Sequence, residues 1–140
     1  MRYLITGGGT GGHIYPALSI ARSLKELDPE AELLYVGTAT GREAQIVPRS
    51  GLPFATIASG GVVGLGLRQK LRGGFRAALG VLEAMRHIRR FRPHVVIGTG
   101  GFVAGPVLAA ARVLRVPMVI QEQNAFPGVT NRLAARWATA

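Results

Sequence analysis

The sequence contains no cysteine and no long hydrophobic run, and each absence excludes a class of protein. Without cysteine, neither a disulfide framework nor a thiolate metal site is expected. A membrane-spanning helix needs about 18 consecutive apolar residues, and the sequence has no such stretch, so we expect no span. The N-terminus lacks a basic segment followed by an apolar one, so we expect no signal peptide. The 140 residues are therefore predicted to form one globular domain.

Acidic and aromatic residues are also scarce. Seven Asp and Glu residues stand against 17 Lys and Arg residues, which gives a net charge of +10. This imbalance favours a polyanionic partner: a nucleic acid, an anionic membrane surface or a phosphorylated substrate. Nucleic-acid surfaces usually interleave aromatic residues for base stacking, and the most basic stretch contains only Phe75 and Phe91. We therefore expect no nucleic-acid partner, and a nucleic-acid binder is the weaker alternative.

Glycine, by contrast, is abundant, and five glycines fall within the six positions 7–12. An apolar run at 3–5 precedes them, and apolar residues at helical spacing follow at 14–21. A strand, a glycine loop and a helix start, in that order, favour an anion site. The glycines let backbone N–H groups approach a ligand, and the helix N-terminus adds a partial positive charge. The alternative is that these glycines only make a tight turn from strand to helix.

Apolar runs and helical patterns alternate along the whole chain. Strands are predicted at 2–6, 32–36, 54–58, 94–97 and 117–121. Helices are predicted at 14–27, 42–47, 103–114 and 128–138, and a further long helix follows the glycine-rich link 60–66 and ends near residue 91. Strict alternation with short connections predicts an α/β fold with a doubly wound parallel sheet. Right-handed crossovers favour a sheet in which the third, second, first, fourth and fifth strands lie in that order. The chain stops inside or just after the last predicted helix, without a terminator or a polar tail. We expect this end to be a cut, at a domain boundary or elsewhere in a longer protein, and a natural end is the alternative.

A second glycine loop, at 98–105, follows the fourth predicted strand. In the predicted order, this strand lies beside the first one, and the strand order reverses between them. Ligands of such sheets bind in the crevice at that switch point, outside the carboxyl ends of the strands. Both loops therefore open onto one crevice, and two adjacent anion sites suit a diphosphate.

Two familiar nucleotide sites fit the first loop poorly. Gly7, Gly9 and Gly12 match the G-x-G-x-x-G dinucleotide pattern, but the second predicted strand ends at Val36 without the acidic residue that holds the ribose. A P-loop requires lysine after its last glycine, and His13 stands there instead.

The stretch from 68 to 92 is basic and amphipathic, with eight Arg and Lys residues and Glu83 as the only acid. Apolar residues on the glycine-rich link before it, together with its first basic residues, suit shallow insertion into an anionic bilayer. The alternative is a helix that packs on the sheet and has a solvated basic back. The predicted membrane patch comprises Val62, Val63, Leu65, Leu67, Arg68, Lys70, Leu71, Arg72, Phe75 and Arg76.

Four consecutive polar residues, 121–124, follow the fifth predicted strand on the same side as the crevice. Amide and carboxylate groups there suit recognition of sugar hydroxyl groups, with Glu122 and Gln123 as supporting residues of the cleft. The alternative is ordinary loop polarity with an N-cap for the next helix.

Three motifs, at 8–13, 100–106 and 122–132, come in an order and spacing that resemble the MurG family of peptidoglycan glycosyltransferases. The resemblance covers the whole chain. It implies a GT-B architecture, in which two Rossmann-like domains enclose a cleft, with residues 1–140 as the N-terminal, acceptor-binding domain. The resemblance also implies a C-terminal donor-binding domain, which we do not expect within residues 1–140. The family transfers N-acetylglucosamine from UDP-N-acetylglucosamine to lipid I, which makes lipid II on the cytoplasmic face of the bacterial membrane.

The resemblance also implies roles for particular residues. His13 corresponds to a histidine proposed as the general base, or as a key residue of the acceptor site. The donor, UDP-N-acetylglucosamine, is implied to contact Thr10, Gly11, Gly12 and Asn124. The acceptor diphosphate is implied to lie at the two glycine loops, at Gly8, Gly9, Gly100, Gly101, Phe102 and Gly105. The family usually has histidine at the position of Gln121 and tyrosine at that of Phe102, so roles of those side chains do not carry over.

The family pattern implies an inverting reaction without a metal or other cofactor. A histidine suits proton removal near neutral pH, and we expect the helix N-terminus to lower the pKa of His13 and keep it neutral. His13 as a capping or positioning residue is the alternative. We expect the isolated chain to fold but to catalyse nothing. The rival interpretation is a non-catalytic, membrane-attached, acceptor-binding subunit that works with a separate donor-domain chain.

Overall fold

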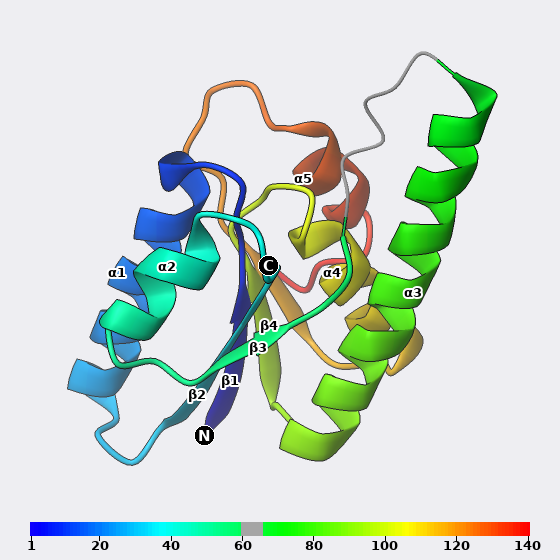
Figure 1. The fold of residues 1–140 in the computed structure, drawn as a ribbon. Coiled ribbons are helices and arrows are strands. Elements are labelled where there is room, and N and C mark those ends of the chain that lie inside the picture. The colour runs from blue at the N-terminus through cyan, green and yellow to red at the C-terminus, as the bar shows by residue number, and fades with distance from the viewer. Residues whose placement is uncertain (60–65) are drawn as a thin grey trace.

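Five parallel strands form one sheet between two layers of helices in the computed structural model, which describes residues 1–59 and 66–140 (Figure 1). The strands are β1 (Arg2–Thr6), β2 (Glu32–Gly37), β3 (Phe54–Thr56), β4 (Val95–Gly98) and β5 (Met118–Ile120). The helices are α1 (Gly11–Leu27), α2 (Glu43–Arg49), α3 (Leu67–Phe91), α4 (Ala104–Val113) and α5 (Val129–Ala134). The sheet order is β3-β2-β1-β4-β5, as predicted, so the predicted fold class is confirmed.

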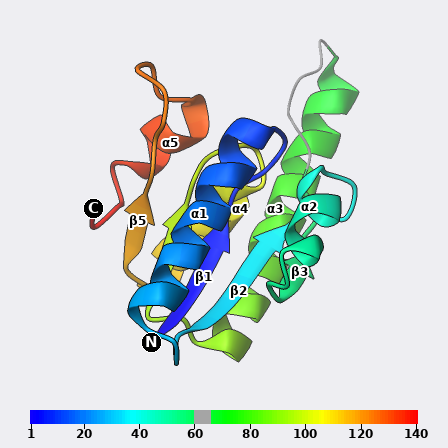
Figure 2. The same ribbon diagram turned by 90° about the vertical axis from the view of Figure 1, so that its left-hand side faces the viewer.

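The two faces of the sheet carry separate hydrophobic cores, because successive residues of a strand point to opposite faces. Within β1, Leu4 packs with α3, α4 and α5, whereas Ile5 packs with α1 and α2. Val96 and Ile97 of β4 divide in the same way. Figure 2 shows α1 in front of the sheet with α3 and α4 behind it. With both faces covered, the carboxyl-end edge is left for ligands.

Three predicted helix boundaries differ from the structure by more than one residue. Helix α1 begins at Gly11 rather than at residue 14, because the Thr10 carbonyl oxygen accepts hydrogen bonds from the N–H groups of His13 and Ile14. Pro48 lies inside the last turn of α2, where its missing N–H costs only one helical bond. Helix α5 ends at Ala134 rather than at residue 138, and the N–H of Thr139 then bonds to the carbonyl oxygen of Met118 beside β5.

Candidate functional site

The candidate site lies where β1 and β4 run side by side, with Thr6 opposite Gly98 at their carboxyl ends. From β1 the chain turns to α1 on one face, and from β4 it turns to α4 on the other face (Figure 1). Loop 1 (residues 7–10) joins β1 to α1, loop 2 (residues 99–103) joins β4 to α4, and the polar corner (residues 121–128) follows β5. The predicted switch-point crevice is therefore bordered by the three segments that the sequence singled out.

Loops 1 and 2 are fastened to each other. The Gly8 N–H donates to the Gly100 carbonyl oxygen at 3.2 Å, and the Thr99 hydroxyl donates to the His13 carbonyl oxygen at 2.6 Å. Gly101 has a φ of +88°, and a methyl group there would lie 2.1 Å from the Gly8 carbonyl oxygen. Only glycine permits both this conformation and this approach. The pair therefore behaves as one support for the crevice.

The N–H groups of loop 1 are not equally available to an anion. Those of Gly8 and Gly9 donate to the Gly100 carbonyl oxygen and to the Glu43 carboxylate, respectively. Among the residues that the structure describes, the N–H groups of Gly11 and Gly12 in the first turn of α1 have no partner. The helix end is therefore the part of this region that is ready to bind an anion. A diphosphate at loop 1 would meet this end rather than the amides of Gly8 and Gly9.

Glu43 of α2 is a buried carboxylate directly behind loop 1. It accepts hydrogen bonds from the Gly9 N–H at 3.2 Å, the Thr38 N–H at 3.0 Å and the Thr38 hydroxyl at 2.7 Å. Burial by itself raises the pKa of Glu43, but these hydrogen bonds together hold the pKa below its ordinary value of 4.5. The sequence reasoning missed this residue, because a lone acid in a short helix carries no pattern that points to loop 1.

His13 lies against loop 2. A methyl group built on Gly100 would be 3.3 Å from the His13 ring, and the buried ring nitrogen Nδ1 has no hydrogen-bond partner among the described residues. Burial lowers the pKa of His13 from 6.5, and the negative charge of Glu122 partly offsets that effect. The predicted direction is confirmed, although burial is the main cause rather than the helix N-terminus. A neutral imidazole is therefore favoured at neutral pH.

Glu122 organises the polar corner. Its carboxylate accepts hydrogen bonds from the Asn124 N–H at 2.9 Å, the Asn124 amide at 3.0 Å, the Gly128 N–H at 3.3 Å and the Asn131 amide at 2.9 Å. The bond from the Asn124 N–H is the main reason why the pKa of Glu122 is lowered. Asn124, a predicted donor contact, is thus held in place by Glu122 and stays exposed.

Asn131 of α5 joins the polar corner to the two loops. It is 2% exposed. A methyl group built on Gly100 would lie 3.3 Å from the Asn131 amide nitrogen and 3.3 Å from the His13 ring, so both side chains lie beside Gly100. Its oxygen Oδ1, the Gln121 oxygen Oε1 and the His13 nitrogen Nδ1 are buried without partners within the described part of the chain. Buried polar atoms normally have partners, so this corner is suited to a polar ligand such as a sugar hydroxyl group. Sequence reasoning treated Asn131 only as part of a motif.

The remaining predicted contacts fall into two groups. Thr10 and Gln123 lie near the N-terminus of α1. A methyl group built on Gly12 would lie 3.6 Å from the Thr10 hydroxyl and 3.8 Å from the Gln123 amide nitrogen. Phe102 is exposed on loop 2, and Gly105 lies in the first turn of α4. No metal-binding group of three His, Asp or Glu side chains exists among the described residues.

The described part of the predicted membrane patch is exposed along α3. Leu67, Leu71 and Phe75 are 75%, 65% and 71% exposed, respectively. Val62, Val63 and Leu65 lie outside the described residues. None of the helices in the two described ranges is both long enough and apolar enough to cross a bilayer.

The sequence matches known proteins over its whole length. Residues 3–140 match the glycosyltransferase family 28 N-terminal domain. The UDP-N-acetylglucosamine–N-acetylmuramyl-(pentapeptide) pyrophosphoryl-undecaprenol N-acetylglucosamine transferase of Symbiobacterium thermophilum is 82% identical over 140 residues. The protein of the same name from Moorella thermoacetica is 57% identical over 135 residues. The match to the Symbiobacterium protein covers all of this chain and 37% of that protein. The match to the Moorella protein covers 96% of this chain and 36% of that protein. The chain therefore spans less than half the length of these relatives.

Solved structures with a similar fold were also found. The MurG of Acinetobacter baumannii superposes with a TM-score of 0.87 at 35% identity, over 99% of this chain and 40% of that one. A UDP-GlcNAc 2-epimerase from Methanocaldococcus jannaschii superposes with a TM-score of 0.67 at 15% identity, over 99% of this chain and 38% of that one, which shows a shared fold alone.

Proposed function

Because the chain belongs to the glycosyltransferase family 28 N-terminal domain family, we propose that it is the acceptor-binding domain of an N-acetylglucosamine transferase. The donor is UDP-N-acetylglucosamine, and the acceptor is lipid I, the N-acetylmuramyl-(pentapeptide) pyrophosphoryl-undecaprenol named in its relatives. The product, lipid II, serves peptidoglycan synthesis and thereby cell shape and division. The enzyme works at the cytoplasmic face of the cell membrane, as a peripheral protein.

The observation that carries this proposal is the convergence of three segments on His13. Loop 1 places the ring at the start of α1, loop 2 packs against it at Gly100, and Glu122 of the polar corner acts on its charge. These segments are far apart in the chain, and each follows the carboxyl end of a strand of the same sheet. An acceptor and a donor held at that edge of the sheet would meet beside one imidazole.

The proposed reaction uses that imidazole as a general base. The neutral His13 ring takes the proton from the acceptor sugar hydroxyl while the hydroxyl oxygen attacks the anomeric carbon of the donor. The bond from that carbon to the UDP oxygen breaks, UDP leaves with the electron pair, and the configuration inverts. Free N–H groups at the helix end, Gly11 and Gly12, are placed to stabilise negative charge. Thr10 and Asn124 complete the proposed donor contacts of this domain, and the donor domain and its own contacts lie beyond it.

The experiment measures N-acetylglucosamine transfer to lipid I by the complete enzyme, its His13→Ala variant and the 140-residue chain. We expect transfer by the complete enzyme, a kcat lowered by roughly 10²–10⁴ in His13→Ala because the general base is lost, and no transfer by the chain alone. His87→Ala on α3 is the matched control and should retain the wild-type rate. A His13→Ala kcat within a few-fold of wild type would refute the base, and no transfer by the complete enzyme would refute the function.

A further inference from the structure

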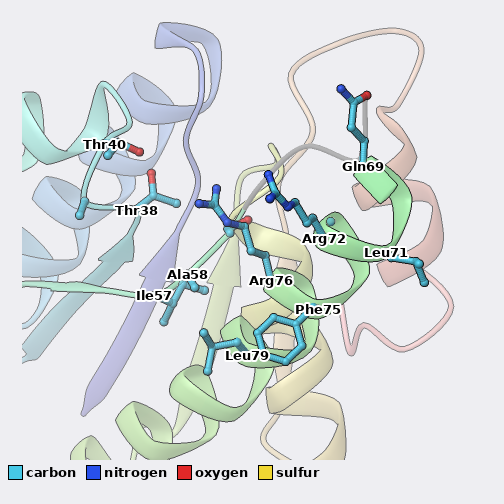
Figure 3. A pocket seen from close by; sticks show the side chains of 13 residues that line it. Thr38, Thr40, Ile57, Ala58, Gln69, Leu71, Arg72, Phe75, Arg76 and Leu79 are labelled. Atoms are coloured by element: carbon cyan, nitrogen blue, oxygen red, sulfur yellow. The ribbon is translucent and has the colours of Figure 1, made fainter. Parts of the chain in front are cut away.

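A second hollow opens beside the crevice, between α3 and the segments that follow β2 and β3 (Figure 3). Its volume is about 970 Å³, which is near the upper end of the usual range for small-molecule sites. Its lining includes Leu71, Arg72, Phe75 and Arg76 of the predicted membrane patch, but none of the proposed catalytic or donor contacts.

The predicted membrane patch divides at this hollow. In Figure 3, the side chains of Arg72 and Arg76 extend toward the segment that carries Thr38 and Thr40, whereas the side chain of Leu71 lies on the other side of α3. The two arginines are four residues apart and so lie on one face of α3. The helix therefore presents a pair of guanidinium groups to the cavity.

These guanidinium groups are not neutralised within the fold. Among the described residues, neither Arg72 nor Arg76 forms an ion pair, and no acidic side chain lines the cavity. Glu43 is the acid that contacts Thr38, and its carboxylate is already occupied by the hydrogen bonds from Thr38 and Gly9. Two converging guanidinium groups without a carboxylate form a strong site for phosphate oxygens.

The rest of the lining is partly apolar. Phe75 and Leu79 border the cavity on α3, and Ile57 borders it after β3. Phe75 is 71% exposed and Leu79 is 39% exposed, so apolar surface leads out of the cavity along the helix. Such a lining fits a phosphate group that is attached to an apolar chain.

Loop 1 is less suited than this cavity to bind a diphosphate. The amides of Gly8 and Gly9 already have partners, and the Glu43 carboxylate lies directly behind them. A diphosphate there would face a buried negative charge, whereas one beside Arg72 and Arg76 faces two positive charges.

We propose that the cavity between α3 and residues 38–40 and 57–59 binds the diphosphate of a polyprenyl-linked substrate, with Arg72 and Arg76 as its ligands and Phe75 and Leu79 along the first part of the polyprenyl chain. The identity of that substrate as the acceptor rests on the proposed function. The site then lies on the same sheet edge as His13, and the apolar tail leaves along the exposed side of α3.

Direct binding tests the site without catalysis. Calorimetry on the complete protein compares farnesyl diphosphate, inorganic pyrophosphate and farnesol as probes. We expect farnesyl diphosphate to bind most tightly, and Arg72→Ala/Arg76→Ala to weaken it by about 10- to 100-fold, since each lost charge-assisted hydrogen bond costs roughly tenfold. Arg86→Ala/Arg89→Ala removes the same charge from exposed positions of the same helix and should change binding less than twofold. Wild-type protein that does not bind farnesyl diphosphate, or equal effects of the two double variants, would overturn the proposal.

Transfer kinetics and vesicle binding distinguish the diphosphate of the lipid-linked acceptor from the phosphate of a membrane phospholipid. In the transfer assay, Arg72→Ala/Arg76→Ala should raise the KM for the lipid-linked acceptor and leave the KM for UDP-N-acetylglucosamine unchanged. Flotation with vesicles of phosphatidylglycerol and phosphatidylcholine should show equal losses for the two double variants. A selective loss of vesicle binding with unchanged farnesyl diphosphate binding would assign the cavity to a phospholipid and overturn the proposal. If the complete protein shows no transfer but the calorimetric result holds, the proposed function fails and the site stands.

Discussion

Two opposing effects set the pKa of His13. Its ring is partly buried against loop 2, which lowers the pKa, and Glu122 raises it by its charge. Neither residue type predicts the outcome alone, because the balance depends on the burial that tertiary packing imposes. The pH dependence of the reaction should therefore report on both residues.

In the complete enzyme, we expect kcat/KM to be constant near neutral pH and to fall below pH 6.5. The base must be neutral, and the pKa of His13 is lowered from 6.5, so activity is lost as the pH falls through the lowered value. Glu122→Gln removes the charge that raises this pKa, so the acid limb should move to lower pH, whatever the variant does to the maximal rate. Glu30→Gln, at an exposed position after the opposite end of α1, should leave the limb in place. Rate measurements between pH 4.5 and 8 check this, and an acid limb that stays fixed or moves upward in Glu122→Gln contradicts it.

At the scale of elements, the two glycine loops act as one unit. Their sequence pattern predicts a strand, a turn and a helix at each, and the structure confirms that arrangement. The Gly8 N–H bonds to Gly100 across the two loops, and the Thr99 hydroxyl bonds to His13 at the start of α1, 86 residues away. Neither contact has a local signature in the sequence. The pattern predicts two loops, and the contact between them makes a single rigid support.

Gly101→Ala should test that unit. The new methyl group would lie 2.1 Å from the Gly8 carbonyl oxygen, at a φ of +88°. We expect a loss of at least about 2 kcal/mol in the free energy of unfolding, from left-handed strain and the displaced loop. Urea denaturation measures this loss. Gly74→Ala is the matched control on α3, where no atom lies within 4 Å of the new methyl group, and should stabilise the protein by roughly 0.5–1 kcal/mol. Equal stabilities of the two variants would show that the loops are not tightly joined.

At the scale of the whole molecule, Glu43 ties together segments on one side of the sheet. Methyl groups on Gly8, Gly37 or Gly41 would each lie 2.4–2.6 Å from its side chain, so three glycines from two loops and a strand end enclose it. A buried carboxylate that accepts several hydrogen bonds makes the stability of the domain depend on pH.

Glu43→Gln should lower the free energy of unfolding by about 1–3 kcal/mol at pH 7, because an amide NH₂ would then face backbone and hydroxyl donors. The folded-state pKa of Glu43 lies below 4.5, so its charge stabilises the fold above pH 4.5, and that contribution is lost as the pH falls through the lowered value. The difference between the variant and wild type should therefore shrink in acid. Urea denaturation from pH 7 to 3 measures it, with Glu26→Gln on the exposed side of α1 as a control that stays within about 0.5 kcal/mol. A difference independent of pH would contradict this role of the carboxylate.

The sequence by itself determined the α/β class, the strand order, the two glycine loops and their crevice, because periodicity, glycine placement and the rules of parallel sheets are local or topological. Only the tertiary structure decided which loop amides are free, which acid stands behind loop 1, that Asn131 and His13 both lie beside Gly100, and that Arg72 and Arg76 extend toward Thr38 and Thr40. Each depends on contacts between distant segments, such as the 34 residues that separate Gly9 from Glu43. Packing of the whole chain selects such contacts, so no local pattern encodes them.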